Sequence, residues 1–280
     1  MHDVIVGVDL DRPHDDSLVW AAEYCRITGQ ELVASVGFEP TEAELPPQWY
    51  DQQMAATRAR VGAVAAVAAG VPFRVDVRYG DPRVVIPVVA AESMATTVVV
   101  GAHGAGGFHH RGLGTVAHHL ARHLPIPMVI VPRSSRPLEG GTVVVGLDGS
   151  PGDVTTADWA RELTKAVRGR LSVVYASDPT SHPHPHPYGA TIADQAELAV
   201  RGEVAEWGTG HDVVTTIEVD QPVEALVHVA DDEDAAVVVV GRKHVGHLGT
   251  LLLGRVPAEL PFEAGRPVAI VPGAVGDVSR

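Results

Sequence analysis

The sequence predicts an α/β protein made of two tandem, doubly wound parallel sheets of five strands each. Two observations carry this prediction. Short runs rich in Val and Ile alternate with segments of helix length, as expected for strands that are buried on both faces of a parallel sheet. The same series of landmarks also occurs twice within 280 residues, a length that accommodates two domains of ordinary size.

The duplication is visible as matched segments in the two halves. The run at residues 4–9 (VIVGVD) recurs as VVVGLD at 143–148, which is 139 residues later. Three further landmarks recur after 140 residues: Asp81-Pro82 with Gln221-Pro222, VVVG at 98–101 with 238–241, and the strand ending in Pro132 with that ending in Pro272. Because these matches keep one order and nearly one spacing, they indicate an internal repeat. We expect domains at residues 1–135 and 140–275.

The elements of the first half follow in order. Strands are expected near residues 3–9, 31–37, 72–78, 97–101 and 127–131, and helices near 15–29, 47–69, 82–94 and 115–123. Pro82 stands where a helix begins, which its fixed φ favours, and Gly29 and Gly70 stand where helices end. Right-handed crossovers then give a doubly wound sheet, whose ligands bind beyond the carboxyl ends of the strands.

Composition argues against several classes of function. The formal charge of −14 argues against a general nucleic-acid binder, because phosphate contacts need clustered Lys and Arg. No apolar run approaches the roughly 18 residues that span a bilayer, and the first residues lack the basic and apolar regions of a signal peptide. Cys25 is the single cysteine, which rules out an internal disulfide and favours a reducing compartment. We therefore expect a cytoplasmic protein with no membrane partner.

A glycine-rich loop follows the fourth expected strand. It begins at Gly101, includes Gly104, and ends at Gly114-Thr115-Val116, where the next helix opens. Glycine lets a ligand approach the main chain closely, and N–H groups that converge at a helix N-terminus suit a phosphate. Taken alone, however, such a loop is equally well explained as a flexible connection.

The spacing Gly101-x2-Gly104-x9-Gly114-Thr115 resembles the nucleotide loop of the universal stress protein family. The first strand, the Gly80-Asp81-Pro82 helix start and the last strand of each half resemble that family too, so the likeness covers nearly the whole chain. It implies the adenine nucleotide alpha hydrolase-like fold, with strand order 3-2-1-4-5, and ATP held in the crevice. A homodimer is expected, since closed symmetry is the commonest form of assembly.

The resemblance also implies roles for individual residues. In the first half, Asp9 would contact the adenosine moiety and Val36 would contact adenine through its backbone. The base and ribose would lie against Val100 and Gly101. The phosphates would be held by Gly104, Gly114, Thr115 and Val116. The corresponding set in the second half, which we interpret as a degenerate site, is Asp148, Ala176, Gly241, Gly254 and Arg255.

Both halves depart from the family pattern. The first loop of the first half carries Asp11, Asp15 and Asp16, which would repel a triphosphate unless Mg²⁺ intervenes. Their alternative role, which we favour, is to stabilise the positive end of the next helix. In the second half His244 replaces the middle glycine and Arg255 replaces the hydroxyl residue, so that half either offers cations to an anion or keeps its loop for packing alone. We favour packing.

Histidines invite a metal hypothesis that the spacing does not support. Residues 182–187 alternate His with Pro, which is typical of a semi-rigid surface loop and not of a structural zinc site. His119 and His123 share a helix face, but no glutamate of the zinc-protease kind stands beside them. We expect no resident metal other than Mg²⁺ brought by a nucleotide.

Three functions remain open, in order of preference. The first is a module that binds ATP or a related adenine nucleotide and reports on stress. The second is an interaction scaffold with relic sites. The third, an ATP-pyrophosphatase or electron-transfer-flavoprotein relative, would need a Ser-Gly-Gly-x-Asp-Ser loop where residues 9–11 read Asp-Leu-Asp. Because there is no nucleophile elbow and no Walker lysine, we expect no catalysis beyond slow ATP hydrolysis.

Overall fold

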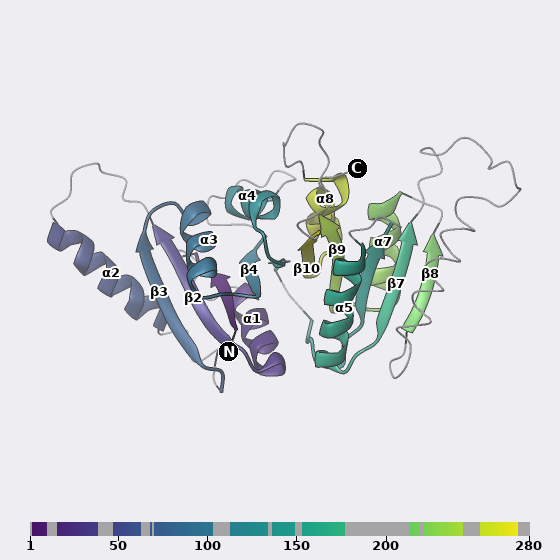
Figure 1. Ribbon diagram of the computed structural model, residues 1–280, viewed down its shortest axis with the longest axis horizontal. Helices are drawn as coiled ribbons and strands as arrows, with labels where there is room; N and C mark the ends of the chain where they lie inside the picture. The colour runs from purple at the N-terminus through teal and green to yellow at the C-terminus, as the bar shows by residue number, and fades with distance from the viewer. Residues whose placement is uncertain are drawn as a thin grey trace, which may run out of the picture. The chain divides into compact units, whose positions relative to one another are not determined.

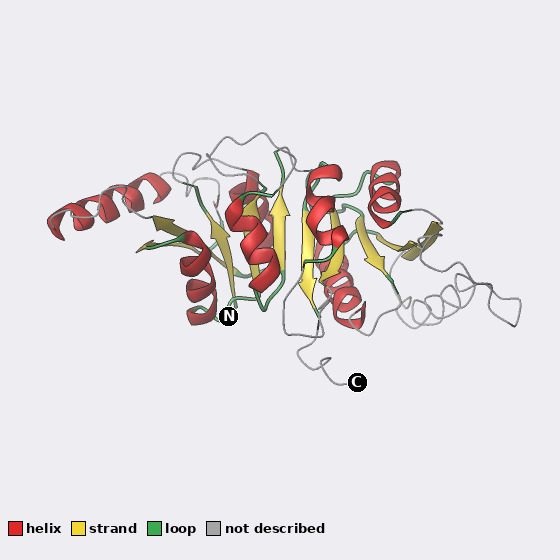
Figure 2. Cartoon of the chain, turned by 90° about the horizontal axis from the view of Figure 1, so that it is seen from above, coloured by secondary structure: helices red, strands yellow, loops and turns green. Residues whose placement is uncertain are grey.

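The protein consists of two compact α/β units, unit 1 (Met1–Ser135) and unit 2 (Arg136–Arg280). The computed structural model describes residues 2–9, 16–38, 47–62, 68, 70–102, 113–133, 136–148, 153–176, 213–218, 221–242 and 253–273. Figure 1 labels the helices of each unit and part of their strands, and Figure 2 shows helices on both sides of the strands.

Unit 1 alternates strands and helices along its whole length. Its elements are β1 (Asp3–Gly7), α1 (Asp16–Thr28), β2 (Glu31–Phe38), α2 (Pro47–Gly62), β3 (Phe73–Tyr79), α3 (Pro82–Glu92), β4 (Thr97–Gly101), α4 (Thr115–His123) and β5 (Met128–Val131). The strands pair in parallel in the order β3-β2-β1-β4-β5. The doubly wound order 3-2-1-4-5 is thereby confirmed.

Unit 2 repeats this plan. Its elements are β6 (Val143–Leu147), α5 (Asp153–Val167), β7 (Leu171–Ala176), β8 (Val213–Glu218), α7 (Pro222–Asp232), β9 (Val237–Arg242), α8 (Arg255–Glu263) and β10 (Val268–Pro272). The order β8-β7-β6-β9-β10 places each strand where its counterpart lies in unit 1. The duplication seen in the sequence is therefore a duplication of the fold.

The predicted helix boundaries hold with one exception. Pro82 is the first residue of α3, and Asp81 caps that helix by accepting the Arg83 N–H at 2.8 Å. Gly29, at φ +71°, follows α1 and donates its N–H to the Cys25 carbonyl at 2.8 Å. The exception is the helix predicted over residues 47–69: the structure describes it as α2 up to Gly62, and residues 63–67 and 69 lie outside the described residues, so its predicted end stays a prediction.

Each sheet is buried on both faces, which explains its Val-rich strands. Val4, Ile5 and Val6 of β1 are fully buried. The helix α1 packs on β1 and β4, with Trp20 buried and stacked on Tyr24 at a ring-centroid distance of 5.3 Å. The helix α3 packs on β1, β2 and α4. Right-handed crossovers place α3 and α4 on the face opposite α1, so both lie over the carboxyl ends of the central strands.

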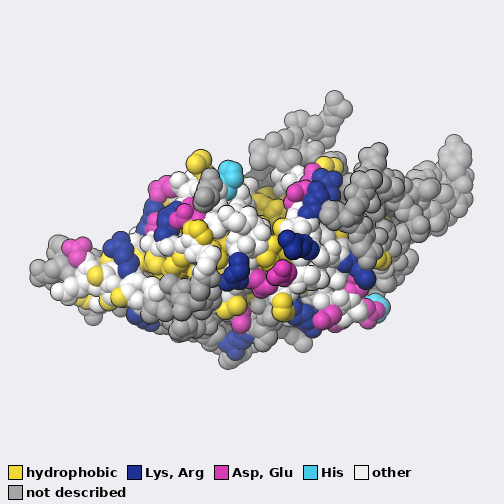
Figure 3. Space-filling model, turned by 90° about the horizontal axis from the view of Figure 1, so that it is seen from below, with side chains coloured by type: hydrophobic (Ala, Val, Ile, Leu, Met, Phe, Trp, Pro, Cys, Tyr) yellow, Lys and Arg dark blue, Asp and Glu magenta, His cyan; other side chains and the backbone are white. Residues whose placement is uncertain are grey.

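Helix length and surface charge concern the two partners that composition argued against, a membrane and a nucleic acid. No helix among the described residues is long and apolar enough to cross a membrane. On the face that Figure 3 shows, Lys and Arg side chains of the described residues are interspersed with Asp and Glu and do not gather into one patch.

Burial raises the pKa of the Cys25 thiol to about 12, so this cysteine behaves as a packing residue.

Candidate functional site

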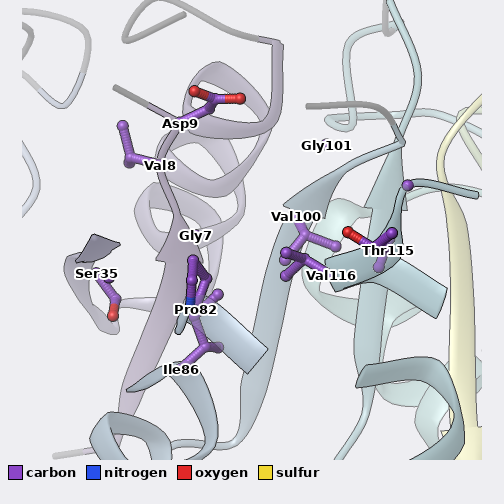
Figure 4. Close-up of a pocket in the computed structure, with 13 residues that line it drawn as sticks. Gly7, Val8, Asp9, Ser35, Pro82, Ile86, Val100, Gly101, Thr115 and Val116 are labelled. Atoms are coloured by element: carbon purple, nitrogen blue, oxygen red, sulfur yellow. The ribbon is translucent and has the colours of Figure 1, made fainter. Parts of the chain in front are cut away.

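A cavity of about 300 Å³ lies at the carboxyl ends of β1, β2 and β4, beneath α3 and α4 (Figure 4). This volume is at the lower end of the range for small-molecule sites, roughly 300–1,000 Å³. The lining residues are Gly7, Val8, Asp9, Ser35, Gly37, Pro82, Ile86, Val100, Gly101, Gly114, Thr115, Val116 and Ala117. The cavity therefore lies where a doubly wound sheet is expected to bind a ligand.

Most of the residues singled out from the sequence in unit 1 line this one cavity. They are Asp9, Val100, Gly101, Gly114, Thr115 and Val116. Val36 is not among them, because alternate residues of a strand point to opposite faces, and the cavity is lined by its neighbours Ser35 and Gly37. Gly104 lies outside the described residues.

One end of the cavity is formed by the start of α4. Gly114 is the N-cap of this helix, has no side-chain cap, and donates its N–H to the Ala102 carbonyl at 3.1 Å. This bond ties the helix start to the end of β4. The first-turn N–H groups of a helix lack intrahelical acceptors and carry the positive end of the helix dipole. Thr115 and Val116, on this side of the cavity in Figure 4, belong to that turn.

The other end is narrow and apolar because two glycines let α3 approach the sheet. A Cβ on Gly7 would lie 2.9 Å from Ile86 Cδ1. A Cβ on Gly37 would lie 2.9 Å from the Gly80 carbonyl oxygen and 3.0 Å from the Pro82 backbone. Close packing at these positions sets Pro82 and Ile86 against β1 and β2. The wall that results suits a flat apolar group.

Ser35 is the one polar side chain at the apolar end of the described lining. It lies in β2 opposite Gly7 in the parallel register, and it is only 1% exposed. Sequence reasoning missed it, although a lone hydroxyl in the apolar run at 32–38 was a usable signal. Ile86, Gly7 and Gly37 were missed as well, because only the folded sheet brings α3 over β1 and β2.

Three titratable groups outside the cavity lining belong to the helices of unit 1 or to a helix cap: Asp16, Asp81 and His119. Hydrogen bonds from Arg83 hold the pKa of the Asp81 carboxyl below its usual range. Burial, and then the charges of His123 and Arg83, lower the pKa of His119. Asp16 is the first residue of α1, where a negative side chain interacts favourably with the positive end of the helix dipole. Among the described residues, no three His, Cys, Asp or Glu side chains gather closely enough to hold a metal ion.

The counterpart in unit 2 is built on the same register but has different chemistry. Gly254 is the N-cap of α8, and Arg255 begins the helix. The Arg255 guanidinium donates to the Glu259 carboxylate and to the Gln221 side-chain oxygen, both at 2.9 Å. Pro257, which stands where unit 1 has Ala117, has no N–H to offer.

The strands of unit 2 differ at the apolar end too. Gly146 pairs with Val174 as Gly7 pairs with Ser35, so a fully buried valine replaces the hydroxyl. Ala176 accordingly occupies the position of Gly37. Gly241 ends the Val-rich segment of β9, and Asp148 donates its backbone N–H to the Asp153 carboxylate at 2.8 Å.

Comparison with known proteins gives the same two-part division. The family model described as "Universal stress protein family" matches residues 1–132 and again 141–272. Universal stress protein Rv2005c of Mycobacterium tuberculosis is 25% identical over 288 residues, which cover 96% of each chain. Universal stress protein MT1672 of the same species is 32% identical over 142 residues, which cover 46% of this chain and 94% of that protein.

A solved structure supports the fold as well. The crystal structure of a universal stress protein from Archaeoglobus fulgidus superposes with a TM-score of 0.78 at 19% identity, covering 96% of this chain and 98% of that one. The fold is thus the adenine nucleotide alpha hydrolase-like α/β fold, present twice. Because the family model matches both halves and together the matches span nearly the whole chain, the protein belongs to the universal stress protein family, in tandem form.

Proposed function

We propose that unit 1 binds ATP or a related adenine nucleotide, and that the protein serves as a regulatory module of the stress response through this binding. The observation that carries the proposal is the pairing, in one cavity, of an apolar slot at β1 and β2 with the open N-terminus of α4. A nucleotide is likewise apolar and flat at one end and anionic at the other.

The apolar slot would take the base and the ribose. Pro82, Ile86 and Val100 offer apolar contacts to a planar ring. Asp9 lies at the carboxyl end of β1, where its carboxylate can accept a hydrogen bond from a ribose hydroxyl. Val36 would contribute backbone groups at the edge of β2, as the family resemblance implies.

The start of α4 would take the phosphates. Backbone N–H groups of its first turn, the helix dipole and the Thr115 hydroxyl all favour an anion there. Mg²⁺ that arrives with a triphosphate keeps several waters and needs only one or two carboxylates. Asp9 is the one carboxylate among the described lining residues. Those residues include no Lys, His or Cys, which supports a binding role in preference to a catalytic one.

The second candidate is an interaction scaffold, and unit 2 is the observation that favours it. There the guanidinium of Arg255 already faces Glu259 and Gln221, and Pro257 removes a donor from the helix start. If unit 1 binds no nucleotide, both units serve as packing surfaces for partner proteins or for a second copy of the chain.

The test compares Gly114→Asp with Gly254→Asp. Both glycines are N-caps with φ of −53° and −61°, a conformation that Asp adopts readily, so neither change should unfold its unit. An aspartate at 114 would occupy the α4 donors and repel phosphate. We expect ATP affinity measured by calorimetry to fall at least about 100-fold, since like charges brought together cost several kcal/mol.

Gly254→Asp is the matched control and should bind ATP like the wild type. Mass spectrometry of the denatured wild-type protein would identify a nucleotide that copurifies. A folded wild type that releases no nucleotide and gives no heat with ATP would exclude this function and leave the scaffold.

A further inference from the structure

The Ser35 hydroxyl is buried without a hydrogen-bond partner. Its side chain lines the cavity, its exposed fraction is 1%, and Oγ finds no acceptor or donor among the described residues. Buried polar side chains nearly always have a partner, so an exception requires an explanation. An absent ligand is one such explanation, because the partner would then arrive with it.

The register fixes the direction of this side chain. Ser35 pairs with Gly7, and a Cβ on Gly7 would point at Ile86. Neighbours in register on parallel strands point to the same face, and so do residues two apart on one strand. Gly37, two residues on, faces Pro82. The Ser35 hydroxyl therefore faces α3 at the floor of the apolar slot, across the cavity from Thr115 and Val116 (Figure 4).

A serine in the matching strand of unit 2 shows what an internally satisfied hydroxyl looks like. Ser172 of β7 is fully buried, and its Oγ donates to the Glu233 carboxylate at 2.9 Å. At the position equivalent to Ser35, unit 2 has Val174, which is fully buried as well. The fold thus accepts an apolar side chain at this place, and packing alone does not call for a hydroxyl.

We propose that Ser35 is a specificity-determining residue whose hydroxyl hydrogen-bonds the heteroaromatic base of the bound nucleotide. This inference rests on the proposed function and identifies the part of the ligand that the slot recognises. A hydroxyl both donates and accepts, so it suits a ring nitrogen or an exocyclic amine. A phosphate-only ligand, held at α4, does not reach it. In the empty protein the same hydroxyl lowers the stability of unit 1, because it is dehydrated and unpaired.

The experiment is Ser35→Ala with Ser172→Ala as the matched control. Calorimetry with ATP and with inorganic tripolyphosphate separates base recognition from phosphate binding. For Ser35→Ala we expect ATP affinity to fall about tenfold, tripolyphosphate affinity to stay unchanged, and the melting temperature of the nucleotide-free protein to rise by about 2–4 °C. Ser172→Ala should lower the melting temperature and leave ATP binding unchanged.

A second measurement uses only the wild type. Purine riboside triphosphate lacks the exocyclic amine, and 1-deaza-ATP, 3-deaza-ATP and 7-deaza-ATP each lack one ring nitrogen. At least one of the four should bind about tenfold more weakly than ATP.

The outcomes separate the two proposals. A wild type that binds neither ATP nor tripolyphosphate overturns the nucleotide function itself. If the wild type binds ATP, the role of Ser35 alone is overturned by either of two results. One is that Ser35→Ala binds ATP as tightly as the wild type, and the other is that Ser35→Ala has a lower melting temperature than the wild type. Equal affinity of the wild type for ATP and all four analogues does the same.

Discussion

The two units have one architecture and two different helix starts. In unit 1, α4 opens with Thr115 and has Ala117 as its third residue. In unit 2, α8 opens with Arg255 and has Pro257 at the matching place. Strand order and register are the same in both units. A duplicated sheet therefore keeps its core while the few residues at the carboxyl ends of its strands change freely.

The difference separates residues that the fold needs from residues that we assign to the proposed ligand. Val4 and Val143 are both fully buried, as the parallel sheets require. Ser35 and Val174, in contrast, occupy equivalent positions in the two units, and the first side chain is polar while the second is apolar. Where two copies of one fold differ in polarity at a buried position, the folding of the sheet does not set that polarity, and we attribute the hydroxyl of Ser35 to the proposed ligand.

Ala117→Pro gives α4 the proline that α8 has, and we expect it to have the largest effect among the changes considered next. It removes the third N–H of α4 while keeping a first-turn position that tolerates proline. Because one charge-assisted hydrogen bond to phosphate is lost, we expect ATP affinity to fall by roughly tenfold or more. Calorimetry measures the affinity, and far-UV circular dichroism checks that the fold is retained.

Pro257→Ala is the reciprocal change and restores an N–H to α8. Since Arg255 still fills that helix start with its contacts to Glu259 and Gln221, we expect no gain in ATP binding. If Ala117→Pro binds ATP as tightly as the wild type while remaining folded, the start of α4 does not hold the phosphates. The difference between the starts of α4 and α8 would then be unrelated to phosphate binding.

Arg255→Thr gives unit 2 the residue of unit 1 and should have a modest effect. The Arg255 side chain is 56% exposed and lies 2.9 Å from the Glu259 carboxylate and 3.8 Å from that of Glu224. Exposed pairs contribute up to about 1 kcal/mol, so the free energy of unfolding should fall by no more than that. The loss should shrink at high salt, because salt screens exposed charges.

Arg255→Thr also tests whether the Arg255 cation stabilises unit 2 itself or binds an anion. We infer that Arg255 serves its own unit, in which case tripolyphosphate binds wild type and Arg255→Thr alike. Tripolyphosphate affinity that drops on this substitution would assign Arg255 to an anion site. Urea titrations at low and high salt give the stability, and calorimetry gives the affinity.

The sequence predicted the sheet well because its signals are local and repeated. Strand hydrophobicity, Pro82 at a helix start and Gly29 at a helix end each act within a few residues. The apolar slot could not be predicted in this way, since Ser35 meets Gly7 and Ile86 only through strand pairing and helix packing. The contact of Val36 stays a prediction: the resemblance assigned its backbone to the base, and strand alternation turns only its side chain away from the cavity.

The smallest expected effect is a pH dependence from a histidine of unit 1, at a position where unit 2 has a glutamate. His119 of α4 corresponds to Glu259 of α8, which pairs with Arg255. His119 stacks on His123 at a ring-centroid distance of 4.4 Å, with Arg122 and, from α3, Arg83 and Asp81 also close to it. Burial and the neighbouring cations outweigh Asp81, so the pKa of His119 lies below its ordinary value of 6.5.

The direction of the effect follows from linkage. At high pH the imidazole is neutral in the folded and unfolded chains, and His119 has no influence. As the pH falls through 6.5 the unfolded chain takes up this proton more readily than the folded one, so stability is lost on the acid side. Urea midpoints at about pH 7.5 and about pH 5.5 should therefore differ more for the wild type than for His119→Gln. Equal differences for the two proteins would mean that His119 titrates as it does in the unfolded chain, and that α4 carries no acid-sensitive group at this position.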